Sequence, residues 1–287
     1  MRTACCAEII KNDKIHDCKS FDGSRCMRRA VGCDRVFGRA AADLASPGKA
    51  SGPGWARMRD SLLGQHGGNV SFKVKTNRLR ARVHFGCILD AASRFGAGAG
   101  ADTASALSGN NGMVVPSNRH MCGNANKTAW FFSGRKNVDG RVREECGPEL
   151  LQEIQQAKLR AGTSKGGAFL EPGQVHVTSA PNISCVSKLL HVIGPSSSAE
   201  PGAVLRQLES VYSDVLLKGD ALGLRALFVP AVSTGVLRVP FELSAKAAST
   251  ALLRHPPDGT IEEVHLVTVE NPGAIVFANQ FNEAFSS

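Results

Sequence analysis

The sequence has few aromatic residues and lacks several common signatures. Of its 287 residues only 6% are aromatic, with one tyrosine and two tryptophans. No apolar run approaches the roughly 18 residues that a membrane-spanning helix needs, so we expect no membrane segment. The first residues, MRTACCAEIIKNDK, contain no apolar core of the kind found in secretory signals. We therefore expect an intracellular protein, in the cytoplasm, the nucleus or both.

The cysteine pattern is also incomplete for a metal or disulfide framework. There are nine cysteines, an odd number, and none forms a Cys-x-x-Cys pair. Structural zinc sites usually carry such close pairs, so we expect free thiols and no bound metal.

Positive charge is concentrated at the start of the chain. The formal net charge is +9. Residues 1–80 hold 16 Lys and Arg against 7 Asp and Glu, so the remaining residues hold 18 of each sign. Residues 1–69 show no sustained hydrophobic periodicity, and we expect a poorly ordered, basic, cysteine-containing leader. A solvated leader and one that contacts nucleic acid remain alternatives.

Residues 70–287 have the pattern of one α/β domain. Strands are predicted at 70–76, 79–89, 113–115, 174–180, 189–193, 226–229 and 262–269. Helices are predicted at 138–159 with a break at Gly147-Pro148, at 201–218, after Pro240 as first helical residue, and from Asn271-Pro272 as N-cap and first residue. In the helix at 201–218, the apolar residues between Val204 and Leu216, Tyr212 among them, recur at the spacing of one helix face. Insertions are predicted near 90–112 and 119–137. Alternating strands and helices indicate a largely parallel sheet with helices on both faces.

One stretch has the features of a phosphate-binding loop. Four apolar residues from Ala226 to Val229 run into Pro230 and then into small residues. A buried strand, a tight loop and a helix N-terminus present backbone N–H groups to an anion. Gly235 lets the backbone approach such a ligand, because it has no Cβ.

Four motifs in this order resemble those of the macro domain, an ADP-ribose-binding fold. They are Val114-Val115-Pro116-Ser117-Asn118, then Val138-Asp139-Gly140-Arg141-Val142-Arg143 with Gly147-Pro148-Glu149-Leu150, then Leu189-Leu190-His191-Val192-Ile193-Gly194-Pro195, and finally Pro230-Ala231-Val232-Ser233-Thr234-Gly235-Val236. Macro domains attached to some ADP-ribosyltransferases are similar to the C-terminal portion. The resemblance implies a three-layer α/β/α fold with a mixed, mostly parallel central sheet.

The resemblance also implies a binding site. It places the diphosphate of ADP-ribose on backbone amides of the last motif. The implied ligand-binding residues are Ser233, Thr234, Gly235, Val236, Gly134, Val138 and Leu237. Asn118 is implied to meet the distal ribose, and Asp139 to orient or activate water in hydrolytic members. ADP-ribose is then the ligand, with no cofactor.

Parts of the sequence depart from the family pattern. Cys87 stands where an acidic residue usually contacts adenine, and Leu237 where an aromatic residue usually follows the loop. The segment between Asn118 and Asp139 is longer than usual. Within it, Gly123-Asn124-Ala125-Asn126 is a second candidate for the asparagine motif. Adenine selectivity and catalysis are therefore left open.

Three functions follow as hypotheses. The first is a module that binds ADP-ribose or mono-ADP-ribosylated protein. The second is a hydrolase that removes ADP-ribose from protein side chains, as a glycohydrolase or ester hydrolase, with Asp139 and Asn118 as catalytic residues. The third is a scaffold that binds nucleic acid or protein through the basic leader.

Overall fold

The computed structural model describes residues 69–96, 110–122, 137–163 and 167–286. Apart from Asn69, the predicted leader lies outside the described residues. Most of the two predicted insertions lies outside them as well. None of the helices in the described residues combines the length and the apolar composition that a membrane span requires.

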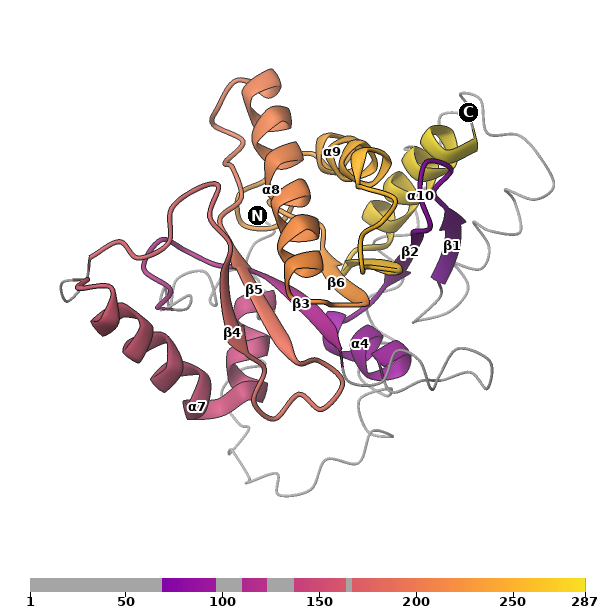
Figure 1. The fold of residues 1–287 in the computed structure, drawn as a ribbon. Coiled ribbons are helices and arrows are strands. Elements are labelled where there is room, and N and C mark those ends of the chain that lie inside the picture. The colour runs from indigo at the N-terminus through magenta and orange to yellow at the C-terminus, as the bar shows by residue number, and fades with distance from the viewer. Residues whose placement is uncertain (1–68, 97–109, 123–136, 164–166, 287) are drawn as a thin grey trace, which may run out of the picture. The chain divides into compact units, whose positions relative to one another are not determined.

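A mixed sheet of seven strands organises the described domain (Figure 1). Its order is β1-β2-β7-β6-β3-β5-β4. The strands are β1 (Asn69–Lys73), β2 (Arg80–Phe85), β3 (Asn111–Pro116), β4 (His176–Ser179), β5 (Lys188–Val192), β6 (Ala226–Pro230) and β7 (Glu263–Thr268). Strands β2, β7, β6, β3 and β5 run parallel, and the two edge strands pair antiparallel. The predicted mixed, mostly parallel sheet is confirmed.

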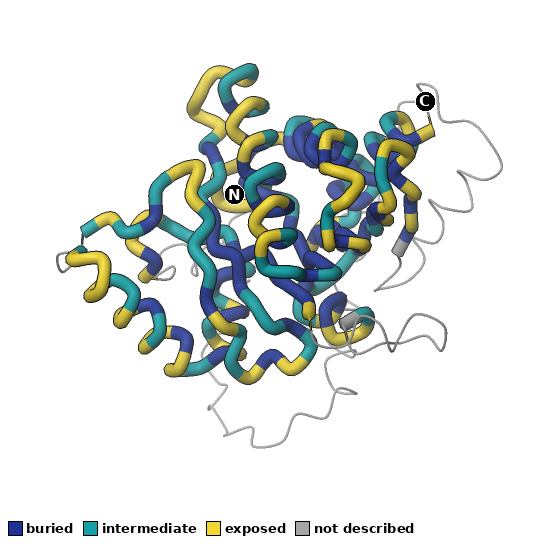
Figure 2. The backbone as a smooth tube through the Cα atoms, in the orientation of Figure 1, coloured by how far each residue is buried: buried dark blue, intermediate teal, exposed yellow. Residues whose placement is uncertain are grey.

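Helices cover both faces of this sheet. They are α4 (Ile88–Gly96), α7 (Val138–Arg160), α8 (Pro201–Ala221), α9 (Phe241–Arg254) and α10 (Asn271–Ser286). One hydrophobic cluster joins the sheet to α8, α9 and α10, and a second joins it to α4 and α7. Figure 2 shows the central strands and the inward helix faces as buried. In β6, Leu227 and Val229 belong to the first cluster and Phe228 to the second, because successive strand residues face opposite sides.

Local sequence signals account for most helix boundaries. Inside α7, Gly147 has φ 69° and ψ −159° and precedes Pro148, so the predicted break is present. Pro240 is the N-cap residue of α9, so this helix begins at Phe241, one residue later than predicted. Residues 90–96, predicted to begin an insertion, form part of α4. The buried side chains of Ala91 and Ala92 explain this, because they place α4 against the sheet.

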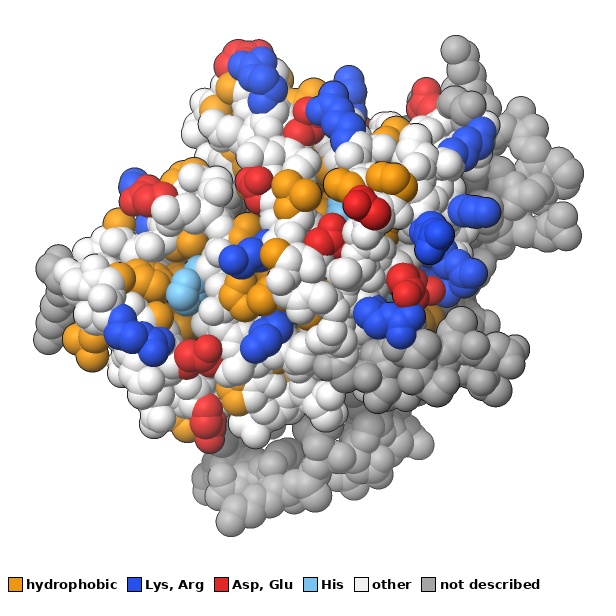
Figure 3. Space-filling model, viewed as in Figure 1, with side chains coloured by type: hydrophobic (Ala, Val, Ile, Leu, Met, Phe, Trp, Pro, Cys, Tyr) orange, Lys and Arg blue, Asp and Glu red, His pale blue; other side chains and the backbone are white. Residues whose placement is uncertain are grey.

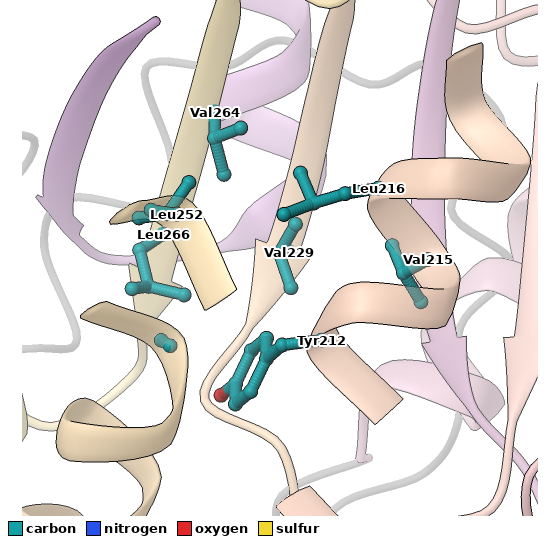
Figure 4. A pocket seen from close by; sticks show the side chains of 8 residues that line it. Tyr212, Val215, Leu216, Val229, Leu252, Val264 and Leu266 are labelled. Carbon is teal, nitrogen blue, oxygen red and sulfur yellow. The ribbon is translucent and has the colours of Figure 1, made fainter. Parts of the chain in front are cut away.

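Helix α8 carries the periodicity that the sequence predicted. Its buried face is formed by Val204, Leu208, Val211, Tyr212, Val215, Leu216 and Gly219. A small apolar cavity of about 10 Å³ lies where α8 and α9 meet β6 and β7. Figure 4 shows the Tyr212 ring among the side chains that line it. A space of this size holds at most one water, so it is a minor packing defect in the core.

Basic side chains are exposed on the β1–β2 hairpin. Lys73, Lys75, Arg78 and Arg80 are all exposed there. On the face drawn in Figure 3, Lys and Arg side chains gather on the side where β1 and β2 lie, and elsewhere the two signs are interspersed. Since β1 is an edge strand, charged residues on it discourage pairing with the edge of another sheet.

Candidate functional site at the carboxyl edge of the sheet

The five parallel strands direct three loops to the same edge of the sheet. These loops follow β3 (residues 117–122), β5 (193–200) and β6 (231–240). Ligands of open α/β sheets bind in the crevice outside the carboxyl ends of the strands. We call the third segment the β6–α9 loop. It contains the predicted diphosphate-binding residues.

The β6–α9 loop is folded by its own backbone. The Thr234 amide and hydroxyl both donate to the Ala231 carbonyl, at 3.5 Å and 3.0 Å. The Val239 amide donates to the Ser233 carbonyl at 3.0 Å. Ser233 adopts a left-handed φ of 66°, which is uncommon for a residue other than glycine. These bonds hold a compact turn between β6 and α9.

The outer part of this loop presents backbone donors. Gly235, Val236 and Leu237 are exposed. Their amides make no hydrogen bond to any other residue that the structure describes. A Cβ added at Gly235 meets nothing within 4 Å, so space lies in front of the loop. The arrangement offers N–H groups to an anion at the edge of the sheet.

Two buried hydroxyls support the loop from below. The Val232 amide donates to the Tyr212 hydroxyl at 3.0 Å, and the Ser244 hydroxyl donates to the Val232 carbonyl at 3.0 Å. Tyr212 and Ser244 are 2.8 Å apart, oxygen to oxygen. Burial raises the pKa of Tyr212 to about 12, although its hydrogen bonds to Ser244 and Val232 oppose that rise. The tyrosine is therefore a neutral hydrogen-bonding group at physiological pH.

The loop after β5 (residues 193–200) packs directly against the β6–α9 loop. The Ser197 amide donates to the Leu237 carbonyl at 3.1 Å. A Cβ on Gly194 would lie 2.1 Å from the Ser233 hydroxyl oxygen, so only glycine allows this approach. The Ser233 hydroxyl is buried and has no hydrogen-bond partner in the described part of the chain. No base activates it there as a nucleophile.

Asp139 lies in the first turn of α7 and is buried. Its Oδ1 is 3.0 Å from Arg143 Nε, and the two side chains are only 4% and 11% exposed. Arg143 Nη2 also donates to the Met121 carbonyl at 3.1 Å. Burial raises the pKa of Asp139, opposed by the charge and hydrogen bond of Arg143 and by a hydrogen bond from Ser117. The ion pair ties the start of α7 to the loop after β3.

A buried histidine continues this polar network. Ser117 Oγ is 3.1 Å from His191 Nδ1, and His191 Nε2 is 2.9 Å from Thr178 Oγ1. Burial, followed by the charges of His176 and Arg143, lowers the pKa of His191 to about 3. His191 is thus a neutral core residue with both ring nitrogens satisfied.

The other predicted site residues lie in different surroundings, and some lie outside the described residues. Asn118 is half-buried, and its Oδ1 accepts the His120 amide at 3.1 Å, so it shapes the turn after β3. Val138 is half-buried at the start of α7. Gly134 and the alternative motif at residues 123–126 lie outside the described residues. Cys87 is half-buried at the end of β2, after Gly86 with φ 135°.

No group of three or more His, Cys, Asp or Glu side chains suited to a metal ion occurs among the residues that the structure describes. The donors at the site are instead amides and hydroxyls. They suit an organic anion better than a bare cation.

The fold and this edge define an α/β/α protein with exposed backbone donors beyond the carboxyl ends of its parallel strands. The macro domain family model matches residues 124–248. A macro domain-containing protein of Streptomyces nogalater is 32% identical over 53% of this chain and 79% of its own length, and one of Streptomyces griseus is 30% identical over 50% and 77%. The chain belongs to the macro domain family.

Solved structures agree on the fold. An Oceanobacillus iheyensis macrodomain with ADP superposes with a TM-score of 0.60 at 18% identity, over 77% of this chain and 99% of its own. A variant of the same macrodomain with ADPR gives a TM-score of 0.59 at 18% identity, over 76% and 100%. The predicted family and fold are confirmed.

Tyr212, Ser244 and Arg143 were not singled out from the sequence. Tyr212 was assigned only to the apolar face of α8. A tyrosine on a buried face needs a partner for its hydroxyl, and it is the only tyrosine in the chain. That signal pointed to a specific role, but the partner lies 32 residues away in the sequence.

Proposed function

We propose that the chain binds ADP-ribose, free or attached to protein, with the diphosphate on the β6–α9 loop. The observation that carries this proposal is the exposed row of amides from Gly235 to Leu237, which have no partner among the described residues. Family membership and a macrodomain structure with ADPR, the usual abbreviation of ADP-ribose, support the choice of ligand. The Ser233 hydroxyl, buried beside these amides without a partner in the described chain, adds a polar group to the same wall.

Gly235→Glu is expected to abolish detectable ADP-ribose binding. The expected loss in affinity is at least about a hundredfold, where each tenfold corresponds to about 1.4 kcal/mol of binding free energy. The new carboxylate would occupy the phosphate position and repel the ligand. Space is open at Gly235 and its φ is not left-handed, so the variant should fold. Isothermal titration calorimetry with ADP-ribose measures the change.

Gly235→Gln is the matched control, since glutamine has the size of glutamate without its charge. It should bind more weakly than the wild type but more tightly than Gly235→Glu. Wild-type protein that binds no ADP-ribose would end the proposal. If Gly235→Glu bound ADP-ribose with wild-type affinity, the diphosphate would have to bind at another loop.

Removal of ADP-ribose from protein is the second candidate function, with Asp139 as its catalytic group. The Arg143 partner and the burial of Asp139 favour a structural role for this carboxylate. We therefore expect Asp139→Asn, which keeps an oxygen for Arg143, to release ADP-ribose from a mono-ADP-ribosylated protein no more slowly than the wild type. A release assay checks this, and a tenfold or greater loss in Asp139→Asn would favour the hydrolase.

The remaining partners stay predictions. Mono-ADP-ribosylated proteins are the partners that this ligand implies. Nucleic-acid binding was predicted for the basic leader, which lies outside the described residues apart from Asn69. An intracellular location is still an expectation from the sequence.

A further inference from the structure

Two side chains, Tyr212 and Ser244, and the backbone of Val232 form a closed ring of hydrogen bonds beneath the β6–α9 loop. Ser244 has one hydroxyl proton, which it donates to the Val232 carbonyl. Tyr212 must then donate to Ser244 Oγ, 2.8 Å away, and it accepts the Val232 amide. Every proton in the ring has one position. Val232, Tyr212 and Ser244 are 0%, 5% and 0% exposed, so water does not replace these bonds.

The ring joins three elements that are far apart in the sequence. Tyr212 lies on α8, Ser244 on α9 and Val232 in the loop between β6 and α9. Because the ring engages both the N–H and the C=O of Val232, it fixes the two peptide planes on either side of that residue. The next residue, Ser233, then turns into the left-handed region, and the exposed amides at Gly235–Leu237 follow after Thr234.

We propose that Tyr212 and Ser244 are positioning residues that hold the β6–α9 loop in its anion-binding conformation before the ligand arrives. The inference rests on the proposed function, because the ligand is taken to be ADP-ribose. A loop that is already ordered raises affinity, because binding then carries no further entropic cost of ordering its backbone. A loop that is only partly in the competent conformation binds more weakly, in proportion to the fraction that is competent.

Neither residue faces the ligand-accessible side of the loop. Tyr212 directs its ring against the small apolar cavity between α8 and α9 (Figure 4), and Ser244 is fully buried. Their effect on affinity would therefore act through Val232. An effect on binding without contact to the ligand separates positioning from direct recognition.

Tyr212→Phe is the sharpest test, because it removes one oxygen atom and keeps the ring that packs against the cavity. We expect it to weaken ADP-ribose binding about tenfold, measured by calorimetry at a temperature where every variant is folded. Ser244→Ala should weaken binding to a similar extent. The double variant should lose no more than about the larger single loss, since both changes open the same ring.

Ser249→Ala is the matched control. Ser249 is also buried on α9, but its hydroxyl donates to the Lys246 carbonyl within the helix, so affinity should stay within twofold of the wild type. If Tyr212→Phe also stays within twofold, the ring is only a folding contact and the inference is wrong.

Amide hydrogen exchange keeps the inference testable without the ligand. If the wild type binds no ADP-ribose, the proposed function fails, yet the conformation of the loop can still be measured. Exchange at the Val232 and Val239 amides, which donate to Tyr212 and Ser233, should then be at least tenfold faster in Tyr212→Phe than in Ser249→Ala. Equal exchange in the two variants would overturn the positioning role.

Discussion

Asp139→Ala is expected to lower the free energy of unfolding by about 3–5 kcal/mol, because breaking a buried ion pair leaves the other charge uncompensated. Arg143 is 11% exposed. In the variant its guanidinium would keep the bond to the Met121 carbonyl and lose its only carboxylate partner among the described residues. Urea denaturation at pH 7 measures the loss.

Two comparisons sharpen this prediction. Glu262→Ala breaks an ion pair whose side chains, Arg225 and Glu262, are 35% and 51% exposed, and it should cost less than about 1 kcal/mol. Asp139→Leu combined with Arg143→Met removes both buried charges and should be more stable than Asp139→Ala. A loss below about 1 kcal/mol in Asp139→Ala would mean that solvent reaches the Arg143 guanidinium.

The second large effect is expected on acidification. Burial, followed by the charges of His265 and Arg82, lowers the pKa of His84 to about 2, and the pKa of His191 is lowered to about 3. In the unfolded chain both titrate near 6.5. The unfolded state therefore binds more protons below pH 6.5, and stability falls as the pH falls. Each histidine contributes about 1.4 kcal/mol per pH unit, so the two remove about 5 kcal/mol between pH 6.5 and 4.5.

The neighbouring carboxylates act at lower pH. The pKa of Glu263 is lowered to about 2: burial opposes this, but hydrogen bonds from His265 and Arg82 prevail. The ionised Glu263 carboxylate therefore stabilises the folded protein above pH 4.5, and this contribution is lost as the pH falls toward 2. The pKa of Asp139 is raised, which has the opposite sign and partly offsets the loss.

His191→Gln provides the variant for the acid experiment. Glutamine keeps a donor and an acceptor for Ser117 and Thr178 but does not titrate. Plots of unfolding free energy against pH, from urea curves at each pH, should be less steep in His191→Gln by about 1.4 kcal/mol per unit between pH 6 and 4. An unchanged slope would mean that His191 does not stay neutral in the folded protein.

The loops after β6 and after β3 differ in the polar groups that they present at this edge of the sheet. The β6–α9 loop presents exposed amides on a rigid, buried support. On the opposite side, Asp139 is paired with Arg143, and Asn118 accepts backbone amides of its own turn. This division supports binding over turnover.

Much of the fold could be predicted from local patterns. The all-apolar run at β6 and the regular spacing on α8 reflect burial that each element requires on its own. The break at Gly147-Pro148 is a local backbone property. The helix α4 was missed because its short apolar face, with Ala91 and Ala92, resembles the small-residue composition of the segment that follows it.

The residues of the chain alone were enough to indicate the α/β class and the family, and they led to the proposal of a phosphate-binding loop. Those features depend on hydrophobic periodicity and on contiguous motifs. The sequence could not show that Tyr212 and Ser244 form a ring of hydrogen bonds with the Val232 backbone. Nor could it show that Arg143 forms a buried ion pair with Asp139. Side-chain hydrogen bonds between distant segments arise only when packing brings the partners within about 3 Å and excludes water. Folding therefore decided how the loop is held and which polar groups remain for a ligand.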